Sequence, residues 1–460
     1  MRIKSTTIYI CVTFLFKLLQ KSLIKRNKLG DLMQIHSKSK IIGKNKIAAK
    51  QATFEKGSGC LSMLNNKGWN LLAEEVSFPI AVINENYLLN NAQWMQEFSD
   101  KSAVKLAPHG KTSMAPYLFK VQLEHGCWGI SLATVPQVIN ASQHGVQRII
   151  LANQLVGNYH MKLIADLLLS TELEFYCFVD SLENIHTLGE YFSAKDVSLN
   201  ILIEIGVSAG RCGWRDAENI SVLLDAIEQY PNLCLCGISF YEGVIHGEES
   251  ESKIKDFIKN ISNLLSKTYK ENRFDSTNII VTGAGSAWYD IVAKELMSNN
   301  AMQDINYTAI IRPGCYLIHD KGIYQTAQNK VTSRSQLACD ISGDLISSLE
   351  LWAYVHSVPE PGLAVIGLGK RDVAFDAGLP TPEYLYRPGS QKPIKVGKSC
   401  QVINIMDQHC MITFDENTSP RPGDLICFSS SHPCLTIDKW RHIGLIDENF
   451  IVKRTIETFF

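Results

Sequence analysis

One lysine stands in a turn bounded by proline and glycine, directly after a short apolar stretch. Residues 105–116 read Lys-Leu-Ala-Pro-His-Gly-Lys-Thr-Ser-Met-Ala-Pro. Pro108 stiffens this turn, and Gly110 allows another segment to approach its backbone closely. A lysine attacks an aldehyde only as the free amine, which a rigid and partly desolvated seat favours. Lys111 is therefore a candidate Schiff-base lysine, and an exposed loop lysine is the alternative.

A second candidate is the run Gly283-Ala284-Gly285-Ser286, which follows the apolar stretch Asn278–Thr282. Small residues leave successive backbone N–H groups open to an anion, and the last strand ends of barrel enzymes often hold a phosphate. A tight turn without a ligand is the alternative for so short a run. Together with a lysine at another strand end, the run predicts pyridoxal phosphate (PLP) as the cofactor.

The third candidate is the pair His432 and Cys434, two positions apart in Ser-His-Pro-Cys. On an extended segment both side chains would project from the same face, so they could grip one metal ion. Imidazole and thiolate together favour Zn²⁺ over magnesium or manganese. A core histidine beside an inert cysteine is the alternative interpretation.

The composition excludes some partners. The 460 residues carry 45 basic and 46 acidic side chains, so their net charge of -1 gives no electrostatic basis for binding nucleic acid. A small molecule is the expected ligand. The 13 cysteines follow no disulfide framework in a chain of this length, which favours a reducing compartment and a cytoplasmic location.

Residues 1–56 are expected to form a mobile N-terminal extension. Met1–Lys4 is basic and Ile8–Leu19 is apolar, so a signal or an anchor segment, with membrane contact of residues 1–30, is the alternative. The apolar stretch is shorter than the roughly 20 residues that span a bilayer. A basic run also stands where small cleavage-site residues would follow.

From Pro79 onward, β-branched runs alternate with stretches of helical apolar spacing, which predicts an α/β fold with a (β/α)8 barrel. The expected strands are Ile80–Ile83, Val104–Leu106, Gly129–Ala133, Arg148–Ala152, Glu174–Val179, Leu199–Ile205, Leu233–Tyr241 and Asn278–Thr282. Active residues of such barrels lie at the C-terminal ends of strands, where each barrel motif named here falls.

After Arg312-Pro313-Gly314 the pattern changes to strands separated by proline and glycine turns. The expected strands are Leu345–Val355, Ala364–Gly367, Ser399–Ile405, Cys410–Phe414 and Leu425–Phe428. This pattern predicts a second, mainly β domain that contains the His432/Cys434 pair. Residues 368–393, rich in glycine and proline, are expected to make a long surface excursion.

Six short motifs together resemble a known family. They are Pro108-His109-Gly110-Lys111-Thr112, Ala152-Asn153-Gln154-Leu155-Val156, Glu204-Ile205-Gly206 leading to Arg211-Cys212-Gly213, Tyr241-Glu242-Gly243, Arg312-Pro313-Gly314 and Ser431-His432-Pro433-Cys434. In this order they resemble the D-serine dehydratase and D-threonine aldolase family, a fold-type III PLP group that shares its barrel with alanine racemase. The sequences of residues 106–112 and 369–373 are most similar to the bacterial amino-acid deaminase branch. The resemblance covers residues 57–445.

The resemblance implies a PLP-binding (β/α)8 barrel of alanine racemase type over residues 57–335, with a lead-in strand from the β domain, and a C-terminal mainly β domain over 336–460. It implies that Lys111 holds the cofactor and that His432 and Cys434 bind zinc. The aldolases of the family carry an aspartate where this chain has Cys434, so the thiolate favours a zinc-dependent dehydratase. A homodimer with sites near the subunit interface is also implied.

The expected reaction converts D-serine or D-threonine into a 2-oxo acid and ammonia, with Lys111 accepting the Cα proton and the metal assisting loss of the β-hydroxyl. The D preference rests on the resemblance alone. Three alternatives stay open: a D-threonine aldolase, a racemase with Tyr316 as its second base, and a non-catalytic PLP-binding homeostasis protein. The sizeable β domain with its His-Pro-Cys pair argues against the last.

Further site residues are expected with a structural role as the alternative for each. Tyr241 would touch the pyridine ring, and His109 would orient the lysine or the ring. Arg211 would face the ring nitrogen, although its charge would oppose protonation of that nitrogen. Weaker candidates for cofactor contact or catalysis are Thr134, Gln154 and Tyr316.

Overall fold

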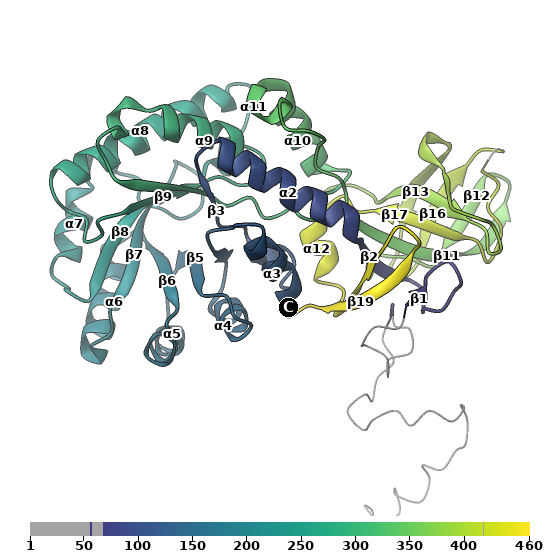
Figure 1. Cartoon of the computed structure of the whole chain (residues 1–460), viewed down its shortest axis with the longest axis horizontal. Coiled ribbons are helices and arrows are strands. Elements are labelled where there is room, and N and C mark those ends of the chain that lie inside the picture. Colours follow the sequence, from purple (N-terminus) through teal and green to yellow (C-terminus); the bar gives the residue numbers. More distant parts are fainter. Residues whose placement is uncertain (1–55, 58–67, 417) are drawn as a thin grey trace, which may run out of the picture. The chain divides into compact units, whose positions relative to one another are not determined.

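The computed structural model describes residues 56–57, 68–416 and 418–460, and these belong to one compact unit (Figure 1). The predicted extension of residues 1–56 lies outside the described residues, apart from Lys56. The ammonium of Lys56 pairs with the carboxylate of Asp372 at 2.8 Å and lies 4.1 Å above the ring of Trp440. Lys56 is thus part of the folded unit.

Eight parallel strands form the sheet that positions the candidate site, in the order β3-β10-β9-β8-β7-β6-β5-β4. They are β3 (Lys105–Leu106), β4 (Ile130–Leu132), β5 (Arg148–Gln154), β6 (Glu174–Val179), β7 (Leu199–Ile205), β8 (Leu233–Phe240), β9 (Ile279–Gly283) and β10 (Tyr307–Ile311). The N–H of Ser131 donates to the carbonyl of Pro108 at 2.9 Å and so links β4 to the segment after β3. This fold is the alanine racemase-type barrel that the sequence predicted.

Helices alternate with these strands because their apolar residues recur at helical spacing. They are α3 (Pro116–Glu124), α4 (Val135–Gln143), α5 (Asn158–Ser170), α6 (Leu182–Lys195), α7 (Ser221–Ile227), α8 (Ser250–Lys270) and α9 (Tyr289–Ser298). In α8, for example, Ile254, Ile258, Ile261 and Leu265 are fully buried, whereas the opposite face is charged. Helices α10 (Ile323–Arg334) and α11 (Gln336–Cys339) follow the last barrel strand.

Two strand assignments from the sequence were wrong. The stretch Ile80–Ile83 is not a barrel strand, because it lies in β2 (Ile80–Asn84), which pairs with β11 and β18 of the other sheet. The eighth barrel strand is instead β10, which pairs in parallel with β9 and β3. An apolar run predicts a strand but not the sheet that it joins. Gly283 therefore ends the seventh barrel strand and not the eighth.

The second sheet has eleven strands and is mainly antiparallel. Besides β2 it contains β1 (Trp69–Asn70), β11 (Leu349–Glu360), β12 (Leu363–Ile366), β13 (Thr381–Tyr386), β14 (Ile394–Lys395), β15 (Cys400–Ile405), β16 (Cys410–Phe414), β17 (Leu425–Ser429), β18 (His442–Ile446) and β19 (Ile451–Glu457). Helix α2 (Glu85–Lys101) leads from β2 to the barrel, and the short α12 (Pro433–Ile437) follows β17 (Figure 1).

The segment 368–393 is not simply a surface excursion. It contains β13, which pairs with β17 and β14, and it buries Val373 and Ala374. Gly/Pro-rich composition marks turns but does not exclude a strand between them. As a result, this segment brings Asp376 to the candidate metal site.

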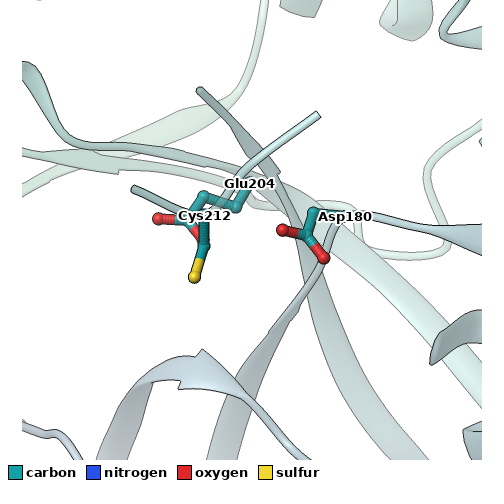
Figure 2. A group of neighbouring side chains, drawn as sticks. All are labelled: Asp180, Glu204 and Cys212. Carbon is teal, nitrogen blue, oxygen red and sulfur yellow. The ribbon is translucent and has the colours of Figure 1, made fainter. Parts of the chain in front are cut away.

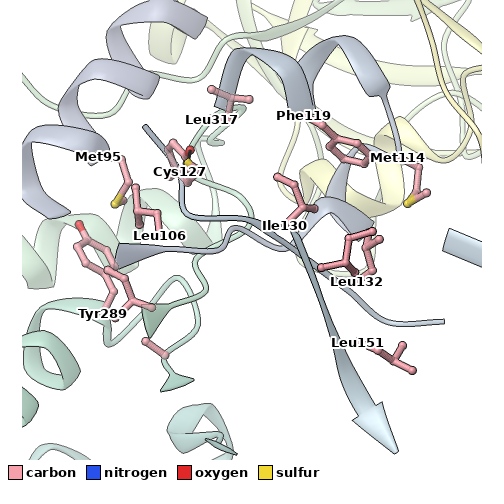
Figure 3. Close-up of a cluster of buried hydrophobic side chains, with 14 of the residues drawn as sticks. Met95, Leu106, Met114, Phe119, Cys127, Ile130, Leu132, Leu151, Tyr289 and Leu317 are labelled. Atoms are coloured by element: carbon pink, nitrogen blue, oxygen red, sulfur yellow. Dashed lines mark hydrogen bonds between the residues drawn. The ribbon is translucent and has the colours of Figure 1, made fainter. Parts of the chain in front are cut away.

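The turn that carries Lys111 sits on a close-packed part of the core. Figure 3 shows Phe119, Ile130 and Leu132 side by side in this cluster. A Cβ atom at Gly110 would lie 2.7 Å from the Phe119 ring and 2.8 Å from Ile130. Glycine is therefore required here, as the sequence predicted, because any side chain would push the turn off the core.

No helix in the described ranges, 56–57, 68–416 and 418–460, is both long and apolar enough to cross a membrane.

Candidate functional site

A cavity opens where the barrel strands end. Residues from the turns after β3, β8, β9 and β10 meet there with α10 and α12. Its lining consists of His109, Lys111, Thr112, Ala152, Phe178, Glu204, Arg211, Tyr241, Ala284, Gly285, Ser286, Arg312, Gly314, Cys315, Tyr324 and Cys434. The predicted lysine, the Gly-Ala-Gly-Ser run and one predicted metal ligand thus border the same space.

Lys111 lies in a single 3-10 turn, Gly110–Thr112, directly after β3. The opposite wall approaches this turn closely at Gly314, where a Cβ atom would lie 2.7 Å from Cβ of His109 and 2.8 Å from Oγ1 of Thr112. The glycine of Arg-Pro-Gly therefore lets the two loops touch. Lys111 is exposed in this structure, so the partly desolvated seat expected from the sequence was wrong for the chain alone.

His109 is half-buried beside Lys111. Burial lowers the pKa of His109 well below its usual value, and the positive charges of Lys111, Arg312 and Arg211 lower it further. The imidazole is therefore neutral at neutral pH. Its Nδ1 atom is buried and lacks a hydrogen-bond partner within the described part of the chain. Such an orphaned polar atom at a cavity wall fits a site that takes a polar ligand.

Arg211 stacks on Tyr241, with the guanidinium carbon 4.3 Å from the ring centre. Tyr241 follows β8, and burial raises the pKa of its hydroxyl, which is therefore neutral. A Cβ atom at Gly285 would lie 3.1 Å from the Tyr241 ring, so glycine keeps this part of the cavity open. A flat aromatic cofactor would find an aromatic face, a cation and a glycine wall here.

The turn after β9 differs from the anion cradle that the sequence predicted. The carboxylate of Glu242 accepts the backbone N–H of Ala284 and that of Gly285, each at 3.0 Å. Glu242 is fully buried, and burial raises its pKa. Two of the N–H groups expected to meet a phosphate are therefore already satisfied. The Ser286 hydroxyl, which accepts the N–H of Cys315 at 3.4 Å, lines the cavity instead.

Arg312, which follows β10, is buried next to the ends of β8 and β9. It donates to Oγ1 of Thr282 at 2.6 Å and to the carbonyl of Phe240 at 3.0 Å. Burial lowers the pKa of Arg312 to about 10, against the attraction of Glu204 and Glu242. The guanidinium thus ties together the ends of β8 and β9 and adds positive charge to the cavity. Sequence reasoning used Arg312 only as part of a motif and assigned it no role.

A further group of possible ligands was also not predicted. Asp180, Glu204 and Cys212 place their ligand atoms within 4.8 Å of one another (Figure 2). Two of them already accept hydrogen bonds. The N–H of Gly213 donates to the carboxylate of Asp180, and Nε2 of Gln154 donates to that of Glu204, each at 2.7 Å. The first bond anchors the loop that carries Arg211 to the end of β6, and the second links the ends of β5 and β7. We therefore assign the group a structural role.

The His432/Cys434 pair has a geometry that the sequence did not predict. His432 caps α12 and Cys434 lies within this helix, so the two do not share a face of an extended segment. Their side chains nevertheless interact, and the neighbouring Cys434 raises the pKa of His432 to about 9. The carboxylate of Asp376 lies 2.7 Å from Nδ1 of His432. Nε2 is then the ring nitrogen that remains for a ligand shared with Cys434. An imidazole held by a carboxylate beside a thiol is a fitting donor set for zinc.

Three side chains hold the sulfur of Cys434. It lies 3.4 Å from Sγ of Cys315 and 3.5 Å from Oγ1 of Thr112, and it also contacts His432. The hydrogen bond with Cys315, followed by those with His432 and Thr112, lowers the pKa of Cys434 well below its usual value. These neighbours therefore favour the thiolate form of Cys434. Cys315 and Tyr324, which complete this wall, were missed because no local pattern links them to Cys434.

Five predicted site residues do not line the cavity, and one of them is His432, described above. Thr134 is exposed and caps α4, and Gln154 bonds to Glu204. Gly283 is buried at the end of β9, against the Phe240 ring. Tyr316 is buried in the core, with its hydroxyl 3.4 Å from Nε2 of Gln122.

Comparisons with known proteins first define the class of fold. Residues 83–294 match the family model described as alanine racemase, N-terminal domain, and residues 348–446 match the putative serine dehydratase domain. The chain is similar in structure to D-threonine aldolase from Filomicrobium marinum, with a TM-score of 0.69, 18% identity and coverage of 86% of this chain and 97% of that one. D-threo-3-hydroxyaspartate dehydratase from Delftia sp. HT23 has a TM-score of 0.64 at 14% identity, over 85% and 99% of the two chains.

In sequence, the chain is 25% identical over 241 residues to D-threonine aldolase from Arthrobacter sp., which covers 51% of this chain and 63% of that protein. An alanine racemase-type barrel followed by a serine dehydratase domain is the domain pair that the resemblance implied. These domain matches and similar proteins agree with the resemblance to the D-serine dehydratase and D-threonine aldolase family. Members of this family are PLP-dependent and act on D-hydroxy amino acids as aldolases or dehydratases.

Proposed function

We propose that the chain catalyses the PLP- and zinc-dependent dehydration of a D-β-hydroxy amino acid, D-serine or D-threonine, to a 2-oxo acid and ammonia. One observation carries this proposal: the side chains of Lys111 and Cys434 line the same cavity. A carbonyl-binding amine and a metal-binding sulfur thus face one small substrate.

Bound in this cavity, PLP would supply an electron sink for the negative charge that develops at the substrate Cα. The Nζ atom of Lys111 would hold the cofactor aldehyde. After the substrate amine has taken its place, the same atom would accept the Cα proton. The neutral imidazole of His109, whose Nδ1 lacks a partner among the described residues, would donate or accept one hydrogen bond without adding charge.

Tyr241 and Arg211 would bind the ring of the cofactor, because they form the aromatic and cationic wall of the cavity. The Ser286 hydroxyl would take part in binding the phosphate, within the turn Gly283–Ser286. The N–H groups of Ala284 and Gly285 would support this turn through Glu242 and would not bind the phosphate directly. Thr134 and Gln154 would act at most through the loops that they hold.

Zinc held by His432 and Cys434 would stabilise negative charge on the leaving β-hydroxyl as a Lewis acid. Hydroxide is a poor leaving group, so this help is what elimination needs. The lowered pKa of Cys434 supports the metal assignment, because zinc binds deprotonated sulfur. Asp376 would fix the orientation of the His432 ring.

D-threonine aldolase is the second candidate, because the Arthrobacter relative and the Filomicrobium structure carry that name. In that reaction a base removes the proton of the same hydroxyl and the Cα–Cβ bond breaks. Cys434 favours the dehydratase, since the resemblance associates an aspartate at this position with aldolases. A racemase is disfavoured because Tyr316 lies in the core, and the match to the dehydratase domain disfavours a non-catalytic binder.

We further propose a homodimer in a reducing, cytoplasmic compartment. The homodimer is the state implied by the family resemblance. The cysteines at 11 described positions are all free thiols, which is consistent with such a compartment. Size-exclusion chromatography with light scattering tests the dimer, and a monomer at micromolar concentration would contradict it.

The variant Lys111→Ala tests the cofactor assignment, with Lys105→Ala, an exposed lysine on β3, as the matched control. We expect Lys111→Ala to lose the visible absorbance of the lysine-bound cofactor together with turnover, and Lys105→Ala to keep both. Full activity in Lys111→Ala would contradict the proposal.

A further inference from the structure

Two cysteine sulfurs meet at one wall of the cavity, and the proposed reaction uses only one of them. Sγ of Cys315 lies 3.4 Å from Sγ of Cys434, although 119 positions separate the two residues. Neither cysteine is in a disulfide. Two other cysteines contact oxygen atoms instead of sulfur. The sulfur of Cys236 lies 3.4 Å from the carbonyl of Cys234, and that of Cys127 lies 3.7 Å from the Tyr316 hydroxyl.

Neighbouring groups hold both sulfurs in place. The hydroxyl of Thr112 lies 3.7 Å from the sulfur of Cys315 and 3.5 Å from that of Cys434. Cys315 follows Gly314, which fits tightly against His109 and Thr112. Cys434 belongs to α12, whose capping residue His432 is held by Asp376. The close approach therefore joins two well-packed elements.

Small molecules can reach this pair. Cys315 and Cys434 both line the cavity that opens at the ends of the barrel strands, and Cys434 is only partly buried. A disulfide has a sulfur–sulfur distance of about 2.0 Å, so the two atoms need to close by about 1.4 Å.

We propose that Cys315 and Cys434 form an oxidisable dithiol, which peroxide converts reversibly into a disulfide. The sulfur of Cys434 attacks one oxygen of hydrogen peroxide and releases hydroxide, which gives a sulfenic acid. The sulfur of Cys315 then displaces the sulfenic hydroxyl, and the S–S bond forms while water leaves. Two thiols lose two electrons in total, and one peroxide is reduced to two molecules of water.

The disulfide has a functional consequence that rests on the function proposed above. A sulfur in a disulfide is no longer a thiolate ligand, so oxidation and zinc binding at Cys434 exclude each other. Oxidation would therefore stop turnover, and a thiol reductant followed by zinc would restore it. Formation of the bond itself depends only on the geometry of the two sulfurs.

The test uses the full-length chain stripped of metal with a chelator and treated with one equivalent of hydrogen peroxide. Peptide mapping without reductant is expected to show one linked peptide that contains Cys315 and Cys434, with a mass loss of two hydrogen atoms. Dithiothreitol is expected to remove the link. If Cys315 instead remains a free thiol while Cys434 is oxidised to sulfinic acid, the proposal is overturned.

Two variants sharpen this result. In Cys315→Ser, Cys434 has no resolving thiol, so its oxidation should proceed to the sulfinic acid and dithiothreitol should not reverse it. The exposed Cys339 on α11 is the matched control, and Cys339→Ser should form the same link as the unmodified chain. A Cys315→Ser variant whose oxidation at Cys434 is fully reversed by dithiothreitol would contradict the role of Cys315.

Zinc separates this inference from the proposed function. We expect bound zinc to slow formation of the linked peptide, because the ion occupies the Cys434 sulfur. If the link forms at the same rate with and without zinc, the dithiol stands and the metal assignment of Cys434 fails. If zinc protects but D-serine and D-threonine are not turned over, the proposed reaction fails and the dithiol again stands.

Discussion

The carboxylate of Asp376 lies 2.7 Å from Nδ1 of His432, and it comes from the segment between β12 and β13. A carboxylate that holds one nitrogen of an imidazole directs the other nitrogen and raises its affinity for a metal. The position of Asp376, 56 residues before His432, gives it no local pattern with the histidine.

Replacing Asp376 should therefore weaken zinc binding. We expect Asp376→Ala to raise the dissociation constant for zinc about 10- to 100-fold, measured by competition with a chromophoric chelator. Asp407→Ala is the control, because Asp407 is exposed in the same sheet region and lies 3.5 Å from the exposed Arg371. Equal zinc affinity in both variants would rule out the orienting role.

Glu242 should stabilise the turn after β9. In Glu242→Gln, an amide NH2 group replaces one of the two oxygens that accept the N–H groups of Ala284 and Gly285. One buried donor is then unsatisfied, which costs about 1–3 kcal/mol of unfolding free energy. Denaturant unfolding measures this cost, and fluorescence titration with PLP should show weaker binding. The exposed Glu248→Gln is the control; an unchanged unfolding midpoint in Glu242→Gln would contradict the role of the buried carboxylate.

Glu350 on β11 should make stability depend on pH. Burial raises the pKa of Glu350 to about 7 in the folded chain, above its usual value of 4.5. A raised folded pKa gives stability that is present below the unfolded value and is lost as the pH rises through the folded value. The unfolding free energy of the chain should thus fall between pH 5 and pH 8, by about 2 kcal/mol from this group.

The variant Glu350→Gln isolates this contribution, because glutamine does not ionise and can still accept the N–H of Trp352. Its free energy of unfolding, relative to that of the unmodified chain, should be higher at pH 8 than at pH 5. A difference between the two chains that does not vary with pH would show that Glu350 does not titrate in this range.

The sequence predicted the parts of the site that follow local rules. Lys111, Tyr241 and Ser286 were placed correctly at strand ends, because alternation of strands and helices defines those ends. The pattern alone did not give the sheet of β2, since an apolar run looks the same in either sheet; only the resemblance implied a lead-in strand from the β domain. Local rules also did not show that Glu242 takes the N–H groups of the Gly-Ala-Gly-Ser turn.

Long-range contacts account for the remaining differences. Cys315, which follows β10 of the barrel, contacts Cys434, which follows β17 of the second sheet. Asp376 contacts His432 from a segment that was expected to lie on the surface. Thr134 and Tyr316 were chosen for their positions near strand ends and motifs, but their side chains cap a helix and fill the core. Position along the chain does not give the direction of a side chain.

The central claim is that one cavity combines the lysine-bound cofactor with a metal that promotes loss of the β-hydroxyl. The most direct test mixes the purified protein with PLP, zinc and D-threonine, with and without a chelator, and assays 2-oxobutanoate and acetaldehyde side by side. We predict 2-oxobutanoate and ammonia, which disappear when zinc is removed and return when it is added back. Acetaldehyde with glycine as the products, or 2-oxobutanoate formation that the chelator does not affect, would contradict the claim.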